Sequence, residues 1–173
     1  VVLARRSALD RFWSCDPDVV LISDYDKGVM TLKFIRQVIT TCRHRGIPCV
    51  ADAKRPPEVY QLATLKCNRD YSDRYIKWWE VHNSQFVQTL GANQPVIRTG
   101  GYDSTKVIGD DLPSVVCTNH VGAGDCFAAH LALALAHGFS LKDAAAIAHS
   151  AGRVYVQHPH NRPPRLEEIQ ADV

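Results

Sequence analysis

Two short apolar runs with one helical stripe between them constrain the fold of this chain more than any other feature. Residues 19–23 read Val-Val-Leu-Ile-Ser, and residues 47–51 read Ile-Pro-Cys-Val-Ala. Continuous apolar runs of this length are typical of strands buried on both faces of a parallel sheet. Residues 31–45 carry apolar side chains at helical spacing, and a basic turn followed by Gly46 ends the helix. A strand–helix–strand unit of about 30 residues has the size of a right-handed crossover, and it predicts an α/β fold.

The size and composition of the chain fit one α/β domain. Its 173 residues carry a net charge of +2, and 46% of them are hydrophobic. This balance excludes a disordered chain, and it favours a single domain over residues 1–173. The small net charge gives little reason to expect nucleic acid as a partner. A membrane is not expected either, because no apolar run approaches the roughly 20 residues that span a bilayer.

Cysteine usage points to a reducing compartment. The chain has six cysteines and no C-x-x-C pair, and its eight histidines do not complete a zinc-binding pattern. Most of the cysteines lie inside apolar segments, where Cys behaves as a small buried hydrophobic residue. We therefore expect the protein in the cytoplasm.

The rest of the chain continues to alternate strands with helices. A short helix is expected over residues 4–14. Residues 72–90, with Trp78, Trp79, Phe86 and Leu90, are interpreted as a further helix. The other expected elements are short strands at 64–67, 95–99, 106–108 and 114–117, helices at 123–137 and 141–157, and a last turn at 165–170.

Both strands of the first unit are followed by a carboxylate. Asp24 comes directly after the first strand, and Asp52 ends the second. Ligands of open α/β sheets bind beyond the carboxyl ends of the strands. We therefore expect both carboxylates to face the functional site.

The segment 119–127, Asn-His-Val-Gly-Ala-Gly-Asp-Cys-Phe, opens a helix that is apolar on nearly every face. A buried helix N-terminus offers unpaired amides and a partial positive charge, and Gly122 and Gly124 let a ligand approach the backbone. Two roles are open for Asp125. It is either a general base that takes a hydroxyl proton, or a carboxylate that only complements the helix dipole, which contributes roughly 0.3–1 kcal/mol.

Residues 122–125 resemble the G-A-G-D signature of the ribokinase-like (PfkB-type) carbohydrate kinases. Asp24-Tyr25-Asp26-Lys27-Gly28 and Asp52-Ala53-Lys54 resemble the D-Y-x-K-G and D-P-K motifs of the family's heptose-phosphate kinase branch, and Thr99-Gly100 resembles its T-x-G. The resemblance implies a ribokinase-like three-layer α/β/α sandwich. It covers only the C-terminal half of such a kinase, and the first strands and the lid over the sugar have no counterpart in these residues.

The resemblance also implies a role for individual residues. Asp125 would be the catalytic base, and the amides of Gly122, Ala123 and Gly124 would form the anion hole. ATP and Mg²⁺ would be the cofactors, and a homodimer is a further implied partner arrangement. The remaining implied roles are nucleotide binding by Asn68, Thr99, Gly100, His149 and Lys54, substrate binding by Asp24, Lys27 and Asp52, and metal binding by Asn68 and Asp70.

Two positions depart from the family pattern. Tyr71 stands where the N-x-x-E motif requires Glu, so that Asp70 or Asp73 would have to supply the carboxylate for Mg²⁺. Arg55 stands where a small Gly usually follows the Lys. The predicted function is an ATP-dependent carbohydrate kinase module that acts on a sugar or sugar phosphate, with heptose 7-phosphate as the candidate. The alternative is a catalytically weak nucleotide-binding remnant of such a kinase.

Overall fold

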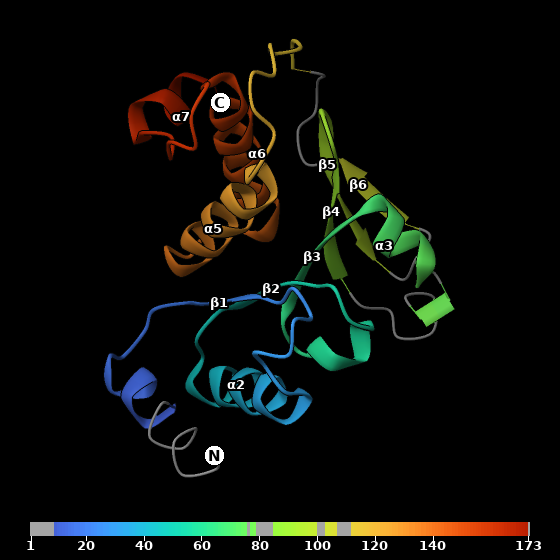
Figure 1. Cartoon of the computed structure of the whole chain (residues 1–173), viewed down its shortest axis with the longest axis vertical. Coiled ribbons are helices and arrows are strands. Elements are labelled where there is room, and N and C mark those ends of the chain that lie inside the picture. Colours follow the sequence, from blue (N-terminus) through green and yellow to red (C-terminus); the bar gives the residue numbers. More distant parts are fainter. Residues whose placement is uncertain (1–8, 76, 79–84, 100–102, 107–111, 173) are drawn as a thin grey trace.

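The computed structural model describes residues 9–75, 77–78, 85–99, 103–106 and 112–172. Its centre is a mixed sheet of six strands in chain order (Figure 1). The first four strands are parallel, and the last two add to them in antiparallel fashion. The strands are β1 (Val20–Ser23), β2 (Cys49–Asp52), β3 (Thr64–Asn68), β4 (Gln85–Leu90), β5 (Asn93–Thr99) and β6 (Asp103–Lys106).

Helices cover both faces of the sheet, as expected for an α/β fold. In Figure 1, α2 lies on one side of β1 and β2, and α5 and α6 lie on the other side. A helical segment at 9–14 precedes β1. The remaining elements are α2 (Leu32–Arg45), η1 (Pro57–Tyr60), α3 (Arg69–Arg74), α5 (Ala123–Ala136), α6 (Leu141–Gln157) and α7 (Leu166–Asp172). Within the described residues, no helix combines the length and the apolar character needed to cross a bilayer.

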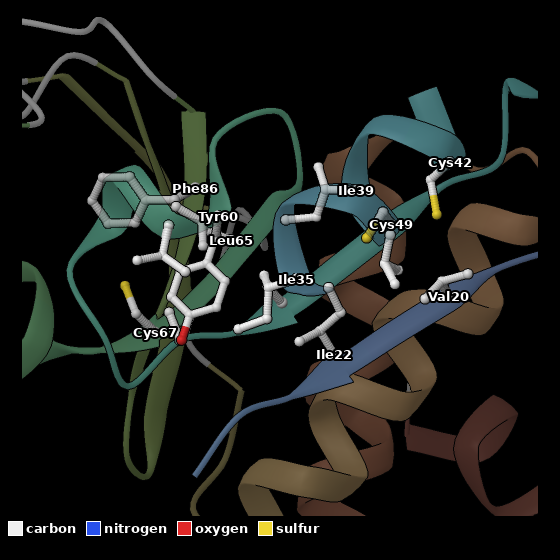
Figure 2. Close-up of a cluster of buried hydrophobic side chains, with 14 of the residues drawn as sticks. Val20, Ile22, Ile35, Ile39, Cys42, Cys49, Tyr60, Leu65, Cys67 and Phe86 are labelled. Atoms are coloured by element: carbon white, nitrogen blue, oxygen red, sulfur yellow. The ribbon is translucent and has the colours of Figure 1, made fainter. Parts of the chain in front are cut away.

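The predicted helix after β1 is confirmed, and its ends have clear physical causes. The Thr31 side chain caps α2 by accepting a hydrogen bond from the Phe34 amide, and Gly46 ends it with φ 69°. The buried face of α2 packs on the sheet. Figure 2 shows Ile35 and Ile39 over the strand residues Ile22 and Cys49. We call this cluster the α2-side core.

The second core lies on the opposite face of the sheet. Val50 belongs to it, whereas its strand neighbours Cys49 and Ala51 belong to the α2-side core. This alternation explains why β2 is buried at every position. Phe127 and Leu131 of α5 pack here with three alanines at the start of α6, and we call this cluster the α5-side core. Two cores on one sheet confirm the three-layer arrangement.

The helix predicted over 72–90 is wrong in its second half. The helix α3 ends at Arg74, and residues 85–90 form β4, which pairs in parallel with β3. Phe86 and Val87 are both buried, but they belong to the cores on opposite faces, so they follow the alternation of a strand. Residue 76 and residues 79–84 of the predicted helix lie outside the described part of the chain.

The two short strands predicted after β5, at 106–108 and 114–117, are also corrected. The strand partner of β5 is β6, at residues 103–106, and residues 114–117 form no strand. Residues 107 and 108 of the predicted strand lie outside the described residues. The helices predicted at 123–137 and 141–157 agree with α5 and α6, and the last turn is the helix α7.

Candidate active site

The candidate site lies where the carboxyl ends of β1, β2 and β3 meet the first turn of α5. The parallel pairing aligns Ser23 with Asp52, and Asp52 with Lys66. Asp24, the next residue after β1, therefore comes to the same edge of the sheet. Its carboxylate is buried and accepts a hydrogen bond from the Tyr60 hydroxyl at 2.7 Å. It also forms an ion pair with Arg55 at 3.0 Å, so protein groups engage it on two sides.

The first turn of α5 presents backbone amides to this edge. Gly122 is the N-cap and adopts φ 86°, with no side chain capping the helix. The Ala123 amide donates to the His120 carbonyl at 3.2 Å, so it is already paired. Among the described residues, the amides of Gly124 and Asp125 find no acceptor. Of the predicted anion-hole amides, Ala123 is therefore engaged and Gly124 is free, and the free amide of Asp125 is one that the sequence analysis did not include.

Asp125 is exposed and contacts a side chain from the opposite end of the chain. The Tyr25 hydroxyl donates to Oδ1 of Asp125 at 2.9 Å and lies 3.1 Å from Oδ2. This hydrogen bond, with lesser effects of burial and of the two nearby carboxylates Asp125 and Asp52, raises the pKa of Tyr25 above its ordinary value. Sequence reasoning noted Tyr25 only as part of a motif and gave it no role.

Lys66 is the second site residue that sequence reasoning missed. Its side chain is buried, and its Nζ lies 3.1 Å from Oδ2 of Asp52. A Cβ atom added at Gly124 would lie 3.1 Å from the same Nζ. A buried cation therefore stands directly beside the start of α5. The sequence signal was a lysine between Leu65 and Cys67, which indicates a buried, paired Lys but does not identify its partner or the site.

Lys54 approaches Asp52 from the other side. Its Nζ lies 3.8 Å from Oδ1 of Asp52, and its side chain stays 44% exposed. The ammonium also lies 5.9 Å from the centre of the Tyr25 ring. The Lys54 side chain is thus more exposed than that of Lys66. Lys27 is also exposed, on the loop that follows Tyr25.

A pocket of about 380 Å³ extends from the start of α5 toward α6. Ala123, Gly124 and Phe127 line one part of it, and His149 and Gly152 of α6 line another. Its size falls in the range of small-molecule sites. His149 is buried, and this burial, followed by the nearby charge of Arg153, lowers the pKa of its imidazole. The ring is therefore held in its neutral form, which suits contact with an uncharged ligand group.

The residues predicted to organise Mg²⁺ do not fit that ion. The Asn68 side chain caps α3 by accepting a hydrogen bond from the Tyr71 amide at 3.0 Å. Tyr71 is buried, and its hydroxyl donates to the Arg55 carbonyl at 2.7 Å. Asp70 and Asp73 are exposed, and no group of three acidic, His or Cys side chains gathers anywhere in the described part of the chain. One free carboxylate beside an engaged amide is a poor donor set for Mg²⁺.

The two departures from the family motifs contact each other. Tyr71 holds the backbone of Arg55, and the Arg55 guanidinium forms ion pairs with Asp24 at 3.0 Å and Asp26 at 2.8 Å. Arg55 also donates to the Met30 carbonyl at 2.9 Å. Together they tie the loop after β1 to α3. Thr99 and Gly100 were also predicted to bind the nucleotide. Thr99 is the last residue of β5, and Gly100 lies outside the described residues.

Comparison with known proteins identifies the family. Residues 19–168 match the family described as pfkB family carbohydrate kinase. The protein called Bifunctional protein HldE from Caulobacter vibrioides is 33% identical over 155 residues, which cover 80% of this chain and 32% of that protein. Its namesake from Nitratiruptor is 31% identical over 166 residues, which cover 88% of this chain and 35% of that protein. This chain belongs to the pfkB family of carbohydrate kinases, and it spans about a third of the length of these relatives.

Solved structures show the same fold. Arabidopsis thaliana ribokinase, determined with ribose and ATP, superposes with a TM-score of 0.70 at 18% identity, over 89% of this chain and 55% of that one. Escherichia coli phosphofructokinase-2, determined with potassium, gives a TM-score of 0.68 at 21% identity, over 89% of this chain and 55% of that one. The ribokinase-like fold expected from the sequence is confirmed.

Proposed function

We propose that this chain is the phosphoryl-transfer module of an ATP-dependent sugar kinase in which Asp125 is the general base. The observation that carries the proposal is the grouping at one sheet edge of an exposed carboxylate, two free amides and a buried cation. A carboxylate can accept a proton, whereas amides and an ammonium stabilise the negative charge of a phosphoryl group. The family shows sugar kinase chemistry in general, and the geometry supports this assignment of roles.

The proposed reaction balances as a single transfer. A sugar hydroxyl oxygen forms a bond to the γ-phosphorus of ATP while the bond from phosphorus to the β,γ-bridging oxygen breaks and ADP leaves. The hydroxyl proton passes to the carboxylate of Asp125. The amides of Gly124 and Asp125, together with the Lys66 ammonium, stabilise charge on the oxygens of the moving phosphoryl group. The nucleotide base occupies the pocket that Gly124 and His149 line.

The proposed acceptor is a sugar phosphate, with heptose 7-phosphate as the first candidate and its 1,7-bisphosphate as the product. The 24–28 and 52–54 motifs support this choice, and so does the similarity to proteins named HldE. The exposed cation Lys27 would bind the phosphate group of the sugar, and Lys54, also exposed, would bind a phosphate of the nucleotide. We further propose a reducing cytoplasmic location, in keeping with six free cysteines, and a homodimer as the assembly to test.

The test is sugar-dependent release of ADP, with and without Asp125→Asn. We expect the variant to lose about 10²- to 10⁴-fold in turnover, the usual contribution of a general base. Asp143→Asn is a matched control, because Asp143 occupies the same position in the first turn of α6 as Asp125 does in α5. If both variants lower stability equally and neither lowers turnover, Asp125 only complements the helix dipole.

A second candidate function is nucleotide binding without turnover. Tyr71, buried in the position of the family's Glu, favours it, because the described residues lack a fitting Mg²⁺ donor set. Isothermal titration with ATP, followed by the ADP-release assay over candidate sugar phosphates, separates the two functions. Binding without sugar-dependent ADP release supports the remnant. Sustained turnover excludes it.

A further inference from the structure

The loop between β1 and α2, residues 24–31, is held firmly on both sides of Tyr25. Asp24 is buried and paired with Tyr60 and Arg55, as described above. Asp26 adopts φ 52°, its amide donates to Oδ1 of Asp24 at 2.9 Å, and its carboxylate pairs with Arg55. The backbone of Tyr25 is therefore fixed by its two neighbours, although its own side chain is 54% exposed.

From this fixed backbone, the Tyr25 side chain reaches across to α5. Its hydroxyl lies 2.9 Å and 3.1 Å from the two oxygens of Asp125, a residue 100 positions away in the chain. Asp125 sits on the exposed first turn of α5, where no other described residue makes a hydrogen bond with its carboxylate. Without Tyr25, the carboxylate would be free to rotate into solvent.

We propose that Tyr25 is the positioning residue of the catalytic base. A phenol donates one proton, so it leaves most lone pairs of the carboxylate free for the acceptor hydroxyl of the sugar. It fixes the orientation of the carboxylate through a hydrogen bond donated to a charged group, which is stronger than one between neutral groups. This inference rests on the proposed function only in taking Asp125 as the base.

The positioning contact extends back to the two motif departures. The Tyr71 hydroxyl donates to the Arg55 carbonyl, and the Arg55 guanidinium forms ion pairs with Asp24 and Asp26. These two aspartates lie on either side of Tyr25 in the chain and fix its backbone. A small Gly at position 55 could not form these ion pairs. Arg55 and Tyr71 therefore act together to fix the loop at residues 24–31, which carries Tyr25. In exchange, position 71 no longer offers a carboxylate for a metal ion.

The first test is a titration of Tyr25, which needs no turnover. The difference in phenolate absorbance between the protein and Tyr25→Phe isolates this one tyrosine. The groups that face it are Asp125, Asp52, Lys54 and Ser23. We expect the Tyr25 pKa to lie above 10.0 and to fall when Asp125 is changed to Asn, because the negative charge that opposes phenolate formation is lost.

A matched tyrosine and a milder loop variant complete this test. Tyr75→Phe, at the end of α3, is the control, and it leaves the titration of Tyr25 unchanged. Asp26→Asn keeps the left-handed backbone, because Asn tolerates positive φ, but it removes the ion pair between Asp26 and Arg55. We expect it to lower the Tyr25 pKa in the same direction as Asp125→Asn. An unchanged titration in Asp125→Asn would overturn the inference.

The second test separates positioning from structure by kinetics. Tyr25→Phe should lower kcat for sugar-dependent ADP release by about 10- to 100-fold, the factor that the loss of a hydrogen bond to a charged group corresponds to. KM for ATP should stay within about twofold of its starting value, since Tyr25 does not line the pocket proposed for the nucleotide base. Unchanged kcat in Tyr25→Phe overturns the positioning role.

The two proposals fail in different ways. If Asp125→Asn keeps full turnover, the proposed function is wrong, whatever Tyr25 does. If Asp125→Asn abolishes turnover while Tyr25→Phe matches the control Tyr75→Phe in kcat, Asp125 is supported as the general base. Only the positioning role of Tyr25 is then refuted.

Discussion

Lys66 is a buried cation that depends on one carboxylate. Its partner Asp52 is 3.1 Å away and also buried. Removing one member of a buried ion pair leaves the other charged and desolvated, whereas removing both is far less costly. The Lys66 ammonium also lies against the positive end of α5, which favours a bound anion there.

Lys66→Met is therefore expected to destabilise the protein by about 3–5 kcal/mol, because Asp52 loses its buried partner and keeps only the more distant, exposed Lys54. The double variant Asp52→Asn with Lys66→Met should recover most of this loss. Urea denaturation measures both. Lys33→Met, on the exposed face of α2, is the control for loss of a charge alone. A double variant as unstable as Lys66→Met would show that the pairing with Asp52 is not what holds Lys66.

The helix α5 begins with a backbone turn that only glycine accommodates well. Gly122 has φ 86°, and a Cβ atom there would lie 2.6 Å from the Tyr155 hydroxyl. That hydroxyl donates to the Val121 carbonyl at 2.8 Å, so it is not free to move away. The turn that places Gly124 and Asp125 thus depends on both the backbone angle and a contact with α6.

Gly122→Ala should lower the free energy of unfolding more than Gly138→Ala. Comparing the two variants separates the backbone strain of a positive φ from the steric clash with Tyr155. Gly138 has φ 81° with open space around its Cβ position, so its substitution carries only the backbone strain of roughly 1–2 kcal/mol. The clash at Gly122 should add about 1–3 kcal/mol. Thermal unfolding compares the variants, and ATP titration should show weaker binding for Gly122→Ala. Equal unfolding temperatures would contradict the clash with Tyr155.

The whole molecule is held together by two cores that share one sheet. The α5-side core contains Leu131, which is fully buried, whereas Leu133 on the same helix is 51% exposed. Because α5 carries the proposed catalytic turn at its start, the packing of its far half on β2 determines where that turn lies.

Leu131→Ala should lower the free energy of unfolding by about 2–5 kcal/mol, since it leaves a cavity between α5 and the sheet. Leu133→Ala removes the same atoms from a largely exposed position, and it should change stability by less than about 0.5 kcal/mol. Chemical denaturation of the two variants makes the comparison. Similar losses in both would show that α5 is not anchored through its sheet-facing side.

Local patterns predicted much of the fold. The β1–α2–β2 unit, β5, α5 and α6 were all predicted, because continuous apolar runs, helical spacing and caps act over a few neighbouring residues. The error at 72–90 came from the same source. Phe86 and Leu90 fit a helical stripe, but burial on both faces of the sheet, a non-local condition, made residues 85–90 a strand.

The site residues also fall into two groups: those that local sequence predicts, and those that only the tertiary structure brings together. The proposed catalytic segment was predicted from neighbouring residues, since Gly122 and Asp125 lie at the start of one helix. Tyr25 and Lys66 could not be assigned to the site from the sequence, because neither is near Asp125 in the chain, and parallel pairing of β1, β2 and β3 brings them together. The link between Tyr71 and Arg55 likewise exists only after α3 packs beside the segment between β2 and η1. Local structure depends on the propensities of neighbouring residues, so the sequence alone predicts it. Contacts between distant residues form only when burial of the two cores sets the positions of the helices and strands.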